Sequence, residues 1–424
     1  MSRGGSPLLV VCYDVGSVSP TRMSRIAAEA GARLAFVCPP TAHARQMRPV
    51  LECHGAVIDA GAYAGVRALG SAVSALHPAG IVTFSERAIE LTAELAAVLG
   101  LPYQDVADIP AIRTKAAQRE RLRKAGVENV RYARVNRLEH SDAALAHVGL
   151  PAIVKPDAGA GSRNTFVVRT AEEYRSGLAA VLSGHRREHE LIVEELLVGR
   201  AVPSPWGDYV AVDCMSRDGA VEPLFITGRF APAEPFRERG GYTPPILPAA
   251  ETERAADLAV RAVRALNIRH GASHTEIKLT EEGPRVIEVN GRVGGWVDDL
   301  AVRSGKPSPA AAAIWYALGR TPGSGLGVPP ASCSGTVYHY AAIAPKSATR
   351  VRALAGLARL RALPGVHQVA VRARPGQALD WRDGTCANVV IAVTGATGSH
   401  EELSALVRRF ESFDWAVFDE AGGA

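Results

Sequence analysis

Polar residues recur at alternate positions in the segment 274–296, whose sequence is HTEIKLTEEGPRVIEVNGRVGGW. Alternation of polar and apolar side chains is typical of strands that have one polar face. The central Thr-Glu-Glu-Gly-Pro stretch interrupts this alternation and predicts a tight turn, so we expect a hairpin. If its loop comprises residues 281–283, with Gly283 left-handed, Glu276 lies directly opposite Glu288 on the polar face.

These opposed carboxylates have a chemical consequence, because like charges that face each other across two strands repel. A cation held between Glu276 and Glu288 removes the repulsion, and Asn290 adds a further oxygen ligand. Oxygen ligands suit Mg2+ rather than zinc. Arg292 would then reach a phosphate held by the same metal. A surface hairpin with its polar side chains in water gives the same pattern, so both interpretations stay open on these residues alone.

The composition describes a globular protein of several domains. A chain of 424 residues exceeds one ordinary core, and 47% of its residues are hydrophobic. The net charge of +5 is spread along the chain, which argues against a nucleic-acid groove or a membrane-binding patch. No apolar run approaches the ~20 residues of a membrane span, and the apolar start at 8–12 is too short for a signal peptide. Six cysteines without a C-x-x-C pair predict a cytoplasmic protein with reduced thiols.

The N-terminal region predicts a parallel βαβ arrangement. We expect strands at 8–13, 34–38 and 82–84, and helices at 22–30 and 88–99. The first strand-to-helix turn lacks the G-x-G-x-x-G of a dinucleotide site. This region is therefore expected to be structural, or to lend residues to a substrate pocket.

A glycine-rich loop follows a lysine in the segment 152–168, AIVKPDAGAGSRNTFVV. The strands expected on either side, ending at Lys155 and starting near Thr165, enclose backbone N–H groups that suit a polyphosphate. The loop is not a Walker A motif, because no G-K-[ST] closes it and no helix follows. An ordinary hairpin turn is the alternative. Upstream, Lys115 and Arg119 share one face of a predicted helix, where side chains are usually solvated.

A second acidic pair, Glu194 and Glu195, lies in the buried strand expected at 191–197. These carboxylates either face water or meet the edge of a purine base. Downstream we expect helices at 251–266 and 308–318, a Gly- and Pro-rich linker at 319–330, and a small α+β region.

The order of these elements resembles the ATP-grasp superfamily over the whole chain, most specifically between Lys115 and Trp296. Within it, HTEIKL together with VIEVNGRVGGW is similar to the carboxylate–amine ligases that join L-amino acids into dipeptides, such as bacilysin synthetase and carnosine synthase. The resemblance implies a multidomain α/β and α+β protein with the ATP-grasp fold. Its expected parts are a Rossmann-like pre-ATP-grasp domain at 1–108, a core at 109–330 with a lid at about 127–200, and a C-terminal α+β domain at 331–424.

The resemblance also implies roles for individual residues. ATP would be bound by Lys115, Lys155, Gly159, Gly161, Ser162, Glu194, Glu195 and Leu197. Asp208 would bind the ribose, although an extra G-R-A-V-P-S-P-W segment places it later in the chain than the resemblance implies. Two Mg2+ ions, replaceable by Mn2+, would be held by Glu276, Glu288 and Asn290. Arg292 and Lys155 would be catalytic. Arg292 would also border the substrate pocket with His274, Gly294, Gly295 and Trp296, and Trp296 would limit the size of the first substrate.

The implied reaction joins two small amino-acid-like molecules through an acyl phosphate and releases ADP and phosphate, and relatives are commonly homodimers. Two alternatives stay open. One is a ligase of the same fold that acts on another carboxylate, such as a biosynthetic intermediate or a glutamate side chain. The other is an ATP-binding protein without ligase activity. Arg229, Arg237 and Arg239, in a loop expected at 227–242, either bind a substrate carboxylate or are solvated.

Overall fold

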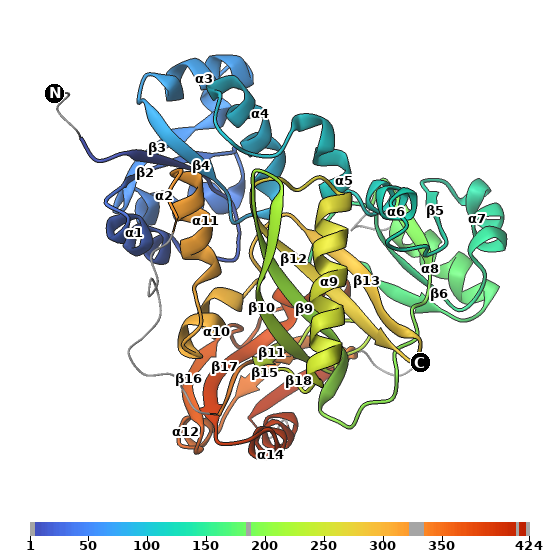
Figure 1. The fold of residues 1–424 in the computed structure, drawn as a ribbon. Coiled ribbons are helices and arrows are strands. Elements are labelled where there is room, and N and C mark those ends of the chain that lie inside the picture. Colours follow the sequence, from blue (N-terminus) through green and yellow to red (C-terminus); the bar gives the residue numbers. More distant parts are fainter. Residues whose placement is uncertain (1–4, 184–187, 322–334, 413–414, 421–424) are drawn as a thin grey trace.

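The computed structural model describes residues 5–183, 188–321, 335–412 and 415–420. Most of the linker expected at 319–330 therefore lies outside the described residues. An N-terminal unit, a lid and a C-terminal region surround a long central sheet (Figure 1). Across the described ranges, no helix combines the length and apolar character needed to cross a membrane.

The N-terminal unit is the expected parallel sheet, in the order β3-β2-β1-β4. Its strands are apolar runs because helices cover the sheet. The strand expected at 82–84 is found at Pro78–Val82 (β4). It starts earlier than expected, since Pro78 already pairs with Leu8 of β1. The elements are β1 (Leu8–Cys12), α1 (Pro20–Glu29), β2 (Arg33–Cys38), α2 (Ala42–Glu52), β3 (Gly55–Asp59), α3 (Val66–Ser74), β4 (Pro78–Val82) and α4 (Ile89–Leu99).

A second, antiparallel sheet in the order β5-β8-β6-β7 lies in the segment expected to form the lid. Two helices, α5 (Ile109–Arg113) and α6 (Lys115–Lys124), lead into it from the N-terminal unit. The elements of the lid are β5 (Tyr132–Val135), α7 (Ser141–Val148), β6 (Ala152–Pro156), β7 (Phe166–Val168), α8 (Ala171–Ser183) and β8 (Leu191–Glu195). Strands β6 and β7 enclose the glycine-rich loop, as expected.

The central sheet has eight strands in the order β13-β12-β9-β10-β11-β14-β17-β16. The last three come from the C-terminal region, which therefore extends the central sheet, while β15 and β18 pair separately. The strands are β9 (Trp206–Arg217), β10 (Ala220–Phe230), β11 (Gly240–Thr243), β12 (Gly271–Thr280), β13 (Gly283–Asn290), β14 (Thr336–Ile343), β15 (Ala348–Leu354), β16 (Val366–Val371), β17 (Val389–Thr397) and β18 (Ala416–Glu420). The domain boundaries at 108 and 330 stay predictions.

Helix α9 (Ala249–Ala265) lies across one face of the central sheet (Figure 1). The apolar stripe predicted for it is confirmed, since Ala255, Leu258, Ala259, Ala262, Val263 and Leu266 are all buried. They pack against alternate residues of the strands, including Val210, Val212, Ile277 and Val289. One face of these strands is thus apolar, and the polar residues between lie on the other. The remaining helices are α10 (Val297–Arg303), α11 (Pro309–Ala317), α12 (Leu357–Arg361), α13 (Gly384–Asn388) and α14 (His400–Glu411).

The hairpin of β12 and β13 has the predicted register at its centre. Glu276 pairs with Glu288, and His274 pairs with Asn290. Because paired residues of antiparallel strands point to the same side, the two carboxylates share one face of the sheet.

The turn of this hairpin differs from the predicted one. Thr280 pairs with Gly283, so only residues 281–282 form the loop, and Gly283 has a φ of +126° rather than a left-handed helical value. Ile287 is left unpaired as a bulge in β13. This extra residue shifts the pairing by one and gives the register that the longer loop would have produced.

Candidate active site

The polar face of the hairpin concentrates negative charge. Burial and the charge of Glu288 raise the pKa of Glu276. Burial also disfavours the Glu288 carboxylate, but Lys115 and Lys155 outweigh that effect and lower its pKa. The Asn290 amide donates a hydrogen bond of 3.2 Å to Glu288. The two lysines therefore favour the ionised form of Glu288. The ionised form of Glu276 is unfavourable unless a further cation binds beside it.

Lys115 is the first residue of α6 and reaches two other elements. Its Nζ lies 3.5 Å from Glu288 Oε2 and donates to the Gly159 carbonyl at 3.2 Å. Asp157 fixes the start of this helix, because its backbone carbonyl accepts from the Lys115 N–H and its Oδ1 accepts from the Ala116 N–H, both at 2.8 Å. The glycine-rich loop and the lysine are thus held together.

Lys155 and Glu194 form an ion pair of 2.7 Å inside the lid. Burial lowers the pKa of Lys155, against the opposing charge of Glu194. Burial alone would raise the pKa of Glu194, but Arg119 and Lys155 lower it to about 2. Only 2% of the Glu194 side chain is exposed, so of the two alternatives for this residue the water-facing one is excluded.

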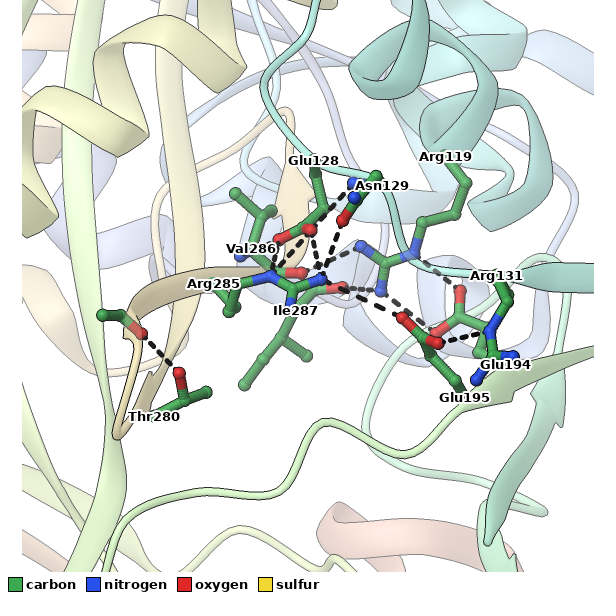
Figure 2. Close-up of polar contacts among 11 residues, drawn as sticks. Arg119, Glu128, Asn129, Arg131, Glu194, Glu195, Thr280, Arg285, Val286 and Ile287 are labelled. Atoms are coloured by element: carbon green, nitrogen blue, oxygen red, sulfur yellow. Dashed lines mark hydrogen bonds and ion pairs between the residues drawn. The ribbon is translucent and has the colours of Figure 1, made fainter. Parts of the chain in front are cut away.

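Arg119 joins three elements, as Figure 2 shows. It donates to both carboxylate oxygens of Glu194, at 2.8 and 3.0 Å. It also donates to the carbonyls of Val286 and Ile287, at 2.9 and 2.7 Å, and so supports the bulge beside Glu288. Its side chain is 3% exposed, so the expectation of a solvated arginine is wrong.

The other residues expected near the nucleotide lie at the end of β8 or just after it, and on β9 of the central sheet. Glu195 pairs with Arg131 at 2.7 Å (Figure 2). Leu197 follows β8 and is half-buried. Asp208 lies on β9, where its Oδ1 is 2.7 Å from Lys278 Nζ. Their contacts with adenine and ribose stay predictions.

The glycine-rich loop has an unusual backbone. Gly159, Gly161, Ser162 and Asn164 have φ values of +135°, +75°, +57° and +48°. Backbones that alternate between right- and left-handed conformations turn N–H groups into a common concavity that suits anions. Several positive φ values in one loop are compatible with such a concavity, and phosphate binding by this loop stays a prediction.

On the other side of Glu276, His274 is held between two charged groups. Its Nδ1 lies 2.9 Å from Asp213 Oδ2, and its Nε2 lies 2.8 Å from Arg229 Nη2. Because a guanidinium can only donate, Nε2 accepts and Nδ1 carries the hydrogen toward Asp213. The second oxygen of Asp213 accepts from the Gly294 N–H at 3.1 Å. A side chain at Gly294 would overlap the His274 ring, so only glycine fits there.

Two neighbouring side chains contact the ring of Trp296. Its ring stacks on His339, with centroids 5.4 Å apart and planes 7° apart, and the Arg229 guanidinium lies 4.4 Å from its centroid. Arg229 also forms an ion pair with Glu238. By contrast, a Cβ at Gly295 would meet nothing, so space adjoins the tryptophan there.

Arg292 is oriented by the N-terminal unit as well as by the hairpin. Its Nε lies 3.4 Å from Glu86 Oε2, and it donates to Asn290 Oδ1 at 3.3 Å and to the Val293 carbonyl at 3.1 Å. Burial raises the pKa of Glu86, against the opposing charge of Arg292. Glu86 follows β4, so the N-terminal unit does lend a residue to the site.

The segment 227–242 is not the solvated loop that was considered as an alternative. Its two ends belong to β10 and β11, and Arg229 and Arg237 are each 1% exposed. Arg237 donates to the carbonyls of Glu234 and Ala344, at 2.7 and 2.8 Å, and Arg239 pairs with Glu411. Of the three arginines, Arg229 alone contacts the predicted site residues.

Four contributors were missed by the sequence-based prediction: Glu86, Asp213, Glu238 and His339. Asp213 carries a usable signal, because it interrupts the otherwise apolar strand YVAVDCM, and a charge there implies a buried partner. The other three come from segments far away in the chain and carry no such local signal.

The residues present fit Mg2+. Among the described residues, no three His, Cys, Asp or Glu side chains gather around one point, so the candidate set is two carboxylates and the Asn290 amide. Mg2+ commonly takes one or two carboxylates from the protein and its remaining ligands from phosphates and water. The lowered pKa of Glu288 and the repulsion at Glu276 both favour a divalent cation there.

Comparison with known proteins agrees with this geometry. Residues 148–299 match the model of the ATP-grasp domain. This match covers most of the lid, β9 to β13, and the hairpin with its carboxylates. Residues 148–299 are thus the part of the chain that is similar to an ATP-grasp domain.

Individual proteins with similar sequences or structures were also found. The chain is 28% identical to the uncharacterized protein y4rH of Sinorhizobium fredii over 80% of its own length and 68% of that protein. It is 30% identical to alanine–anticapsin ligase of Bacillus subtilis over 51% of its length, and this match spans only 48% of the ligase. The crystal structure of the L-amino acid ligase from Bacillus licheniformis superposes with a TM-score of 0.73 at 20% identity, covering 99% of this chain and 100% of that one. That likeness shows the ATP-grasp fold, and the sequence resembles L-amino acid ligases.

Proposed function

We propose that the protein is an ATP-dependent carboxylate–amine ligase that joins two amino-acid-like substrates and releases ADP and phosphate. The observation that supports this most is the shared face of the hairpin. Glu276 opposes Glu288 there, and Lys115 lies 3.5 Å from Glu288. Arg292 comes two residues after the end of β13. Phosphoryl transfer depends on such positioned charges rather than on a protein nucleophile.

In the first step, a substrate carboxylate oxygen attacks the γ-phosphorus of ATP, and the bond to the ADP oxygen breaks. Lys115 and Lys155 neutralise the phosphate oxygens in this proposal, while Glu194 and Arg119 hold Lys155 in place. Mg2+, held by Glu276, Glu288 and Asn290, would supply further neutralisation of the polyphosphate. The product is an acyl phosphate.

In the second step, the amine nitrogen attacks the acyl carbon, phosphate leaves with the bonding electrons, and the nitrogen loses a proton. The Arg292 guanidinium stabilises the oxyanion, and Glu86 orients it from behind at 3.4 Å. Glu238 and Arg229 form an ion pair beside Trp296 and supply charges of both signs for a substrate with an ammonium and a carboxylate, and Arg229 is also held by His274.

The test is phosphate release with all pairs of standard amino acids and a few non-standard ones. We expect ADP and phosphate to form together with an amide, only when two substrates are present. AMP and pyrophosphate as products would contradict the mechanism. Amide formation only with a carboxylate that is not an amino acid would favour the alternative ligase of the same fold.

Replacing Arg292 by alanine is expected to reduce kcat by about a hundredfold or more while changing ATP affinity little. The reason is that Arg292 acts on the acyl group, and the phosphates are contacted by the lysines. Nucleotide titration and amide formation measure the two effects separately. Arg303→Ala provides the control, because Arg303 is a half-buried arginine that pairs with Asp299 on helix α10 and not with a residue of the hairpin. An equal loss of ATP affinity in Arg292→Ala would contradict the assignment.

Trp296→Ala is expected to shift substrate preference toward amino acids with larger side chains, by about tenfold or more in relative kcat/KM. The ring is braced by His339 and Arg229, so it cannot swing aside to admit a large side chain. Competition between alanine and phenylalanine as the acid substrate measures the shift. Unchanged selectivity would place the acid pocket elsewhere.

A further inference from the structure

The glycine-rich loop contacts the C-terminal region as well as the lid. The Thr385 N–H donates to the Gly161 carbonyl at 2.7 Å, and the Asn164 N–H donates to the Arg382 carbonyl at 3.0 Å. On its other side the loop is tied to the lid, where Asn164 and Arg163 contact the Glu188 carboxylate at 2.9 Å. The loop is therefore held at two places that lie far apart in the sequence.

The contact with the C-terminal region depends on a glycine. Gly384 has a φ of +79°, and a Cβ built on it would overlap the Gly161 carbonyl oxygen and lie 2.8 Å from the Arg163 nitrogen. Gly384 and Thr385 are both buried. No residue with a side chain could bring the two backbones this close.

The same threonine also contacts the substrate side of the site. Its hydroxyl oxygen accepts from the Glu238 N–H at 3.0 Å. Glu238 pairs with Arg229, which contacts His274 and lies over Trp296. One residue of the C-terminal region thus hydrogen-bonds both the loop over the phosphates and the segment that carries the charges beside Trp296.

We propose that Thr385, placed by Gly384, is a positioning residue that holds the glycine-rich loop over the reacting phosphates and ties its position to the substrate segment at Glu238. This inference rests on the proposed ligase function. An acyl phosphate must be shielded from water until the amine arrives. Loosening the loop would let water take the place of the amine, so phosphate would be released without amide formation.

The experiment compares Gly384→Ala with Gly376→Ala. Gly376 has a similar φ of +86°, but a Cβ there would meet nothing, so this control carries the same backbone cost without the overlap. Hydrogen exchange of the full-length protein, without substrates, is followed in peptides covering 160–166 and 384–388. We expect exchange about tenfold faster in both peptides for Gly384→Ala and unchanged for Gly376→Ala.

The second measurement is the ratio of phosphate released to amide formed. We expect this ratio to rise about tenfold in Gly384→Ala and to stay at the wild-type value in Gly376→Ala. Thr385→Val, which removes only the hydroxyl, is expected to leave loop exchange unchanged and to raise KM for the amino-acid substrates. Unchanged exchange in Gly384→Ala would overturn the docking of the loop, whatever the reaction is. Faster exchange with an unchanged ratio would overturn the shielding role.

Discussion

Glu288→Gln is expected to lower kcat for amide formation by about a thousandfold or more, because a metal is worth several kcal/mol of transition-state stabilisation and each 1.36 kcal/mol is tenfold in rate. Glu288 is the carboxylate that Lys115 and Lys155 keep ionised. Glutamine preserves the shape but removes the charge, which leaves both lysines facing a neutral amide. Mg2+ titration by calorimetry and the rate of amide formation measure the two losses.

The control for this prediction lies on the same hairpin. Glu282→Gln makes the same chemical change at the exposed turn, and we expect wild-type activity and Mg2+ affinity. Glu276→Gln is expected to have a smaller effect on Mg2+ affinity than Glu288→Gln, because burial and Glu288 already raise the pKa of Glu276. If Glu288→Gln retained more than about a tenth of wild-type activity, Glu288 would not be a metal ligand.

Arg119→Met is expected to lower the free energy of unfolding by about 3–5 kcal/mol, the usual cost of removing one partner of a buried ion pair. Methionine fills much of the volume, but it leaves the Glu194 carboxylate with Lys155 alone and leaves the carbonyls of Val286 and Ile287 without their donor. Urea denaturation measures the loss.

Arg123→Met is the matched control for this second prediction. Arg123 is on the same helix, but its side chain is 56% exposed and pairs with Glu120, one turn earlier on the helix. Exposed pairs of this kind contribute about 0.2–1 kcal/mol, so we expect little change. A loss in Arg119→Met no larger than in Arg123→Met would show that the buried network does not hold the lid to the hairpin.

Local patterns were enough to predict much of the site. Alternating side chains placed Glu276 opposite Glu288, and the structure confirms that register. The apolar stripe of α9 and the loop between β6 and β7 were also predicted from residues that are neighbours in the sequence. In each case the physical determinant is the period of a helix or a strand, which any short segment carries within itself.

Partners of buried charges could not be predicted in this way. Arg119 has the same helical spacing as a solvated arginine, and only packing of the lid against β13 encloses it. Arg229 of β10 contacts His274 of β12 only because both strands flank β9 in the folded sheet. The turn of the hairpin differed too, since the bulge at Ile287 is supported by Arg119 from another element.

The sequence by itself determined the carboxylate-bearing hairpin, the glycine-rich loop and the helix that covers the opposite face of the sheet. The tertiary structure alone decided that the C-terminal strands extend the central sheet and that Thr385 lies against Gly161. Side-chain periodicity is a local property of the chain, whereas hydrogen bonds between distant backbones form only where packing excludes water from both and leaves each needing a partner.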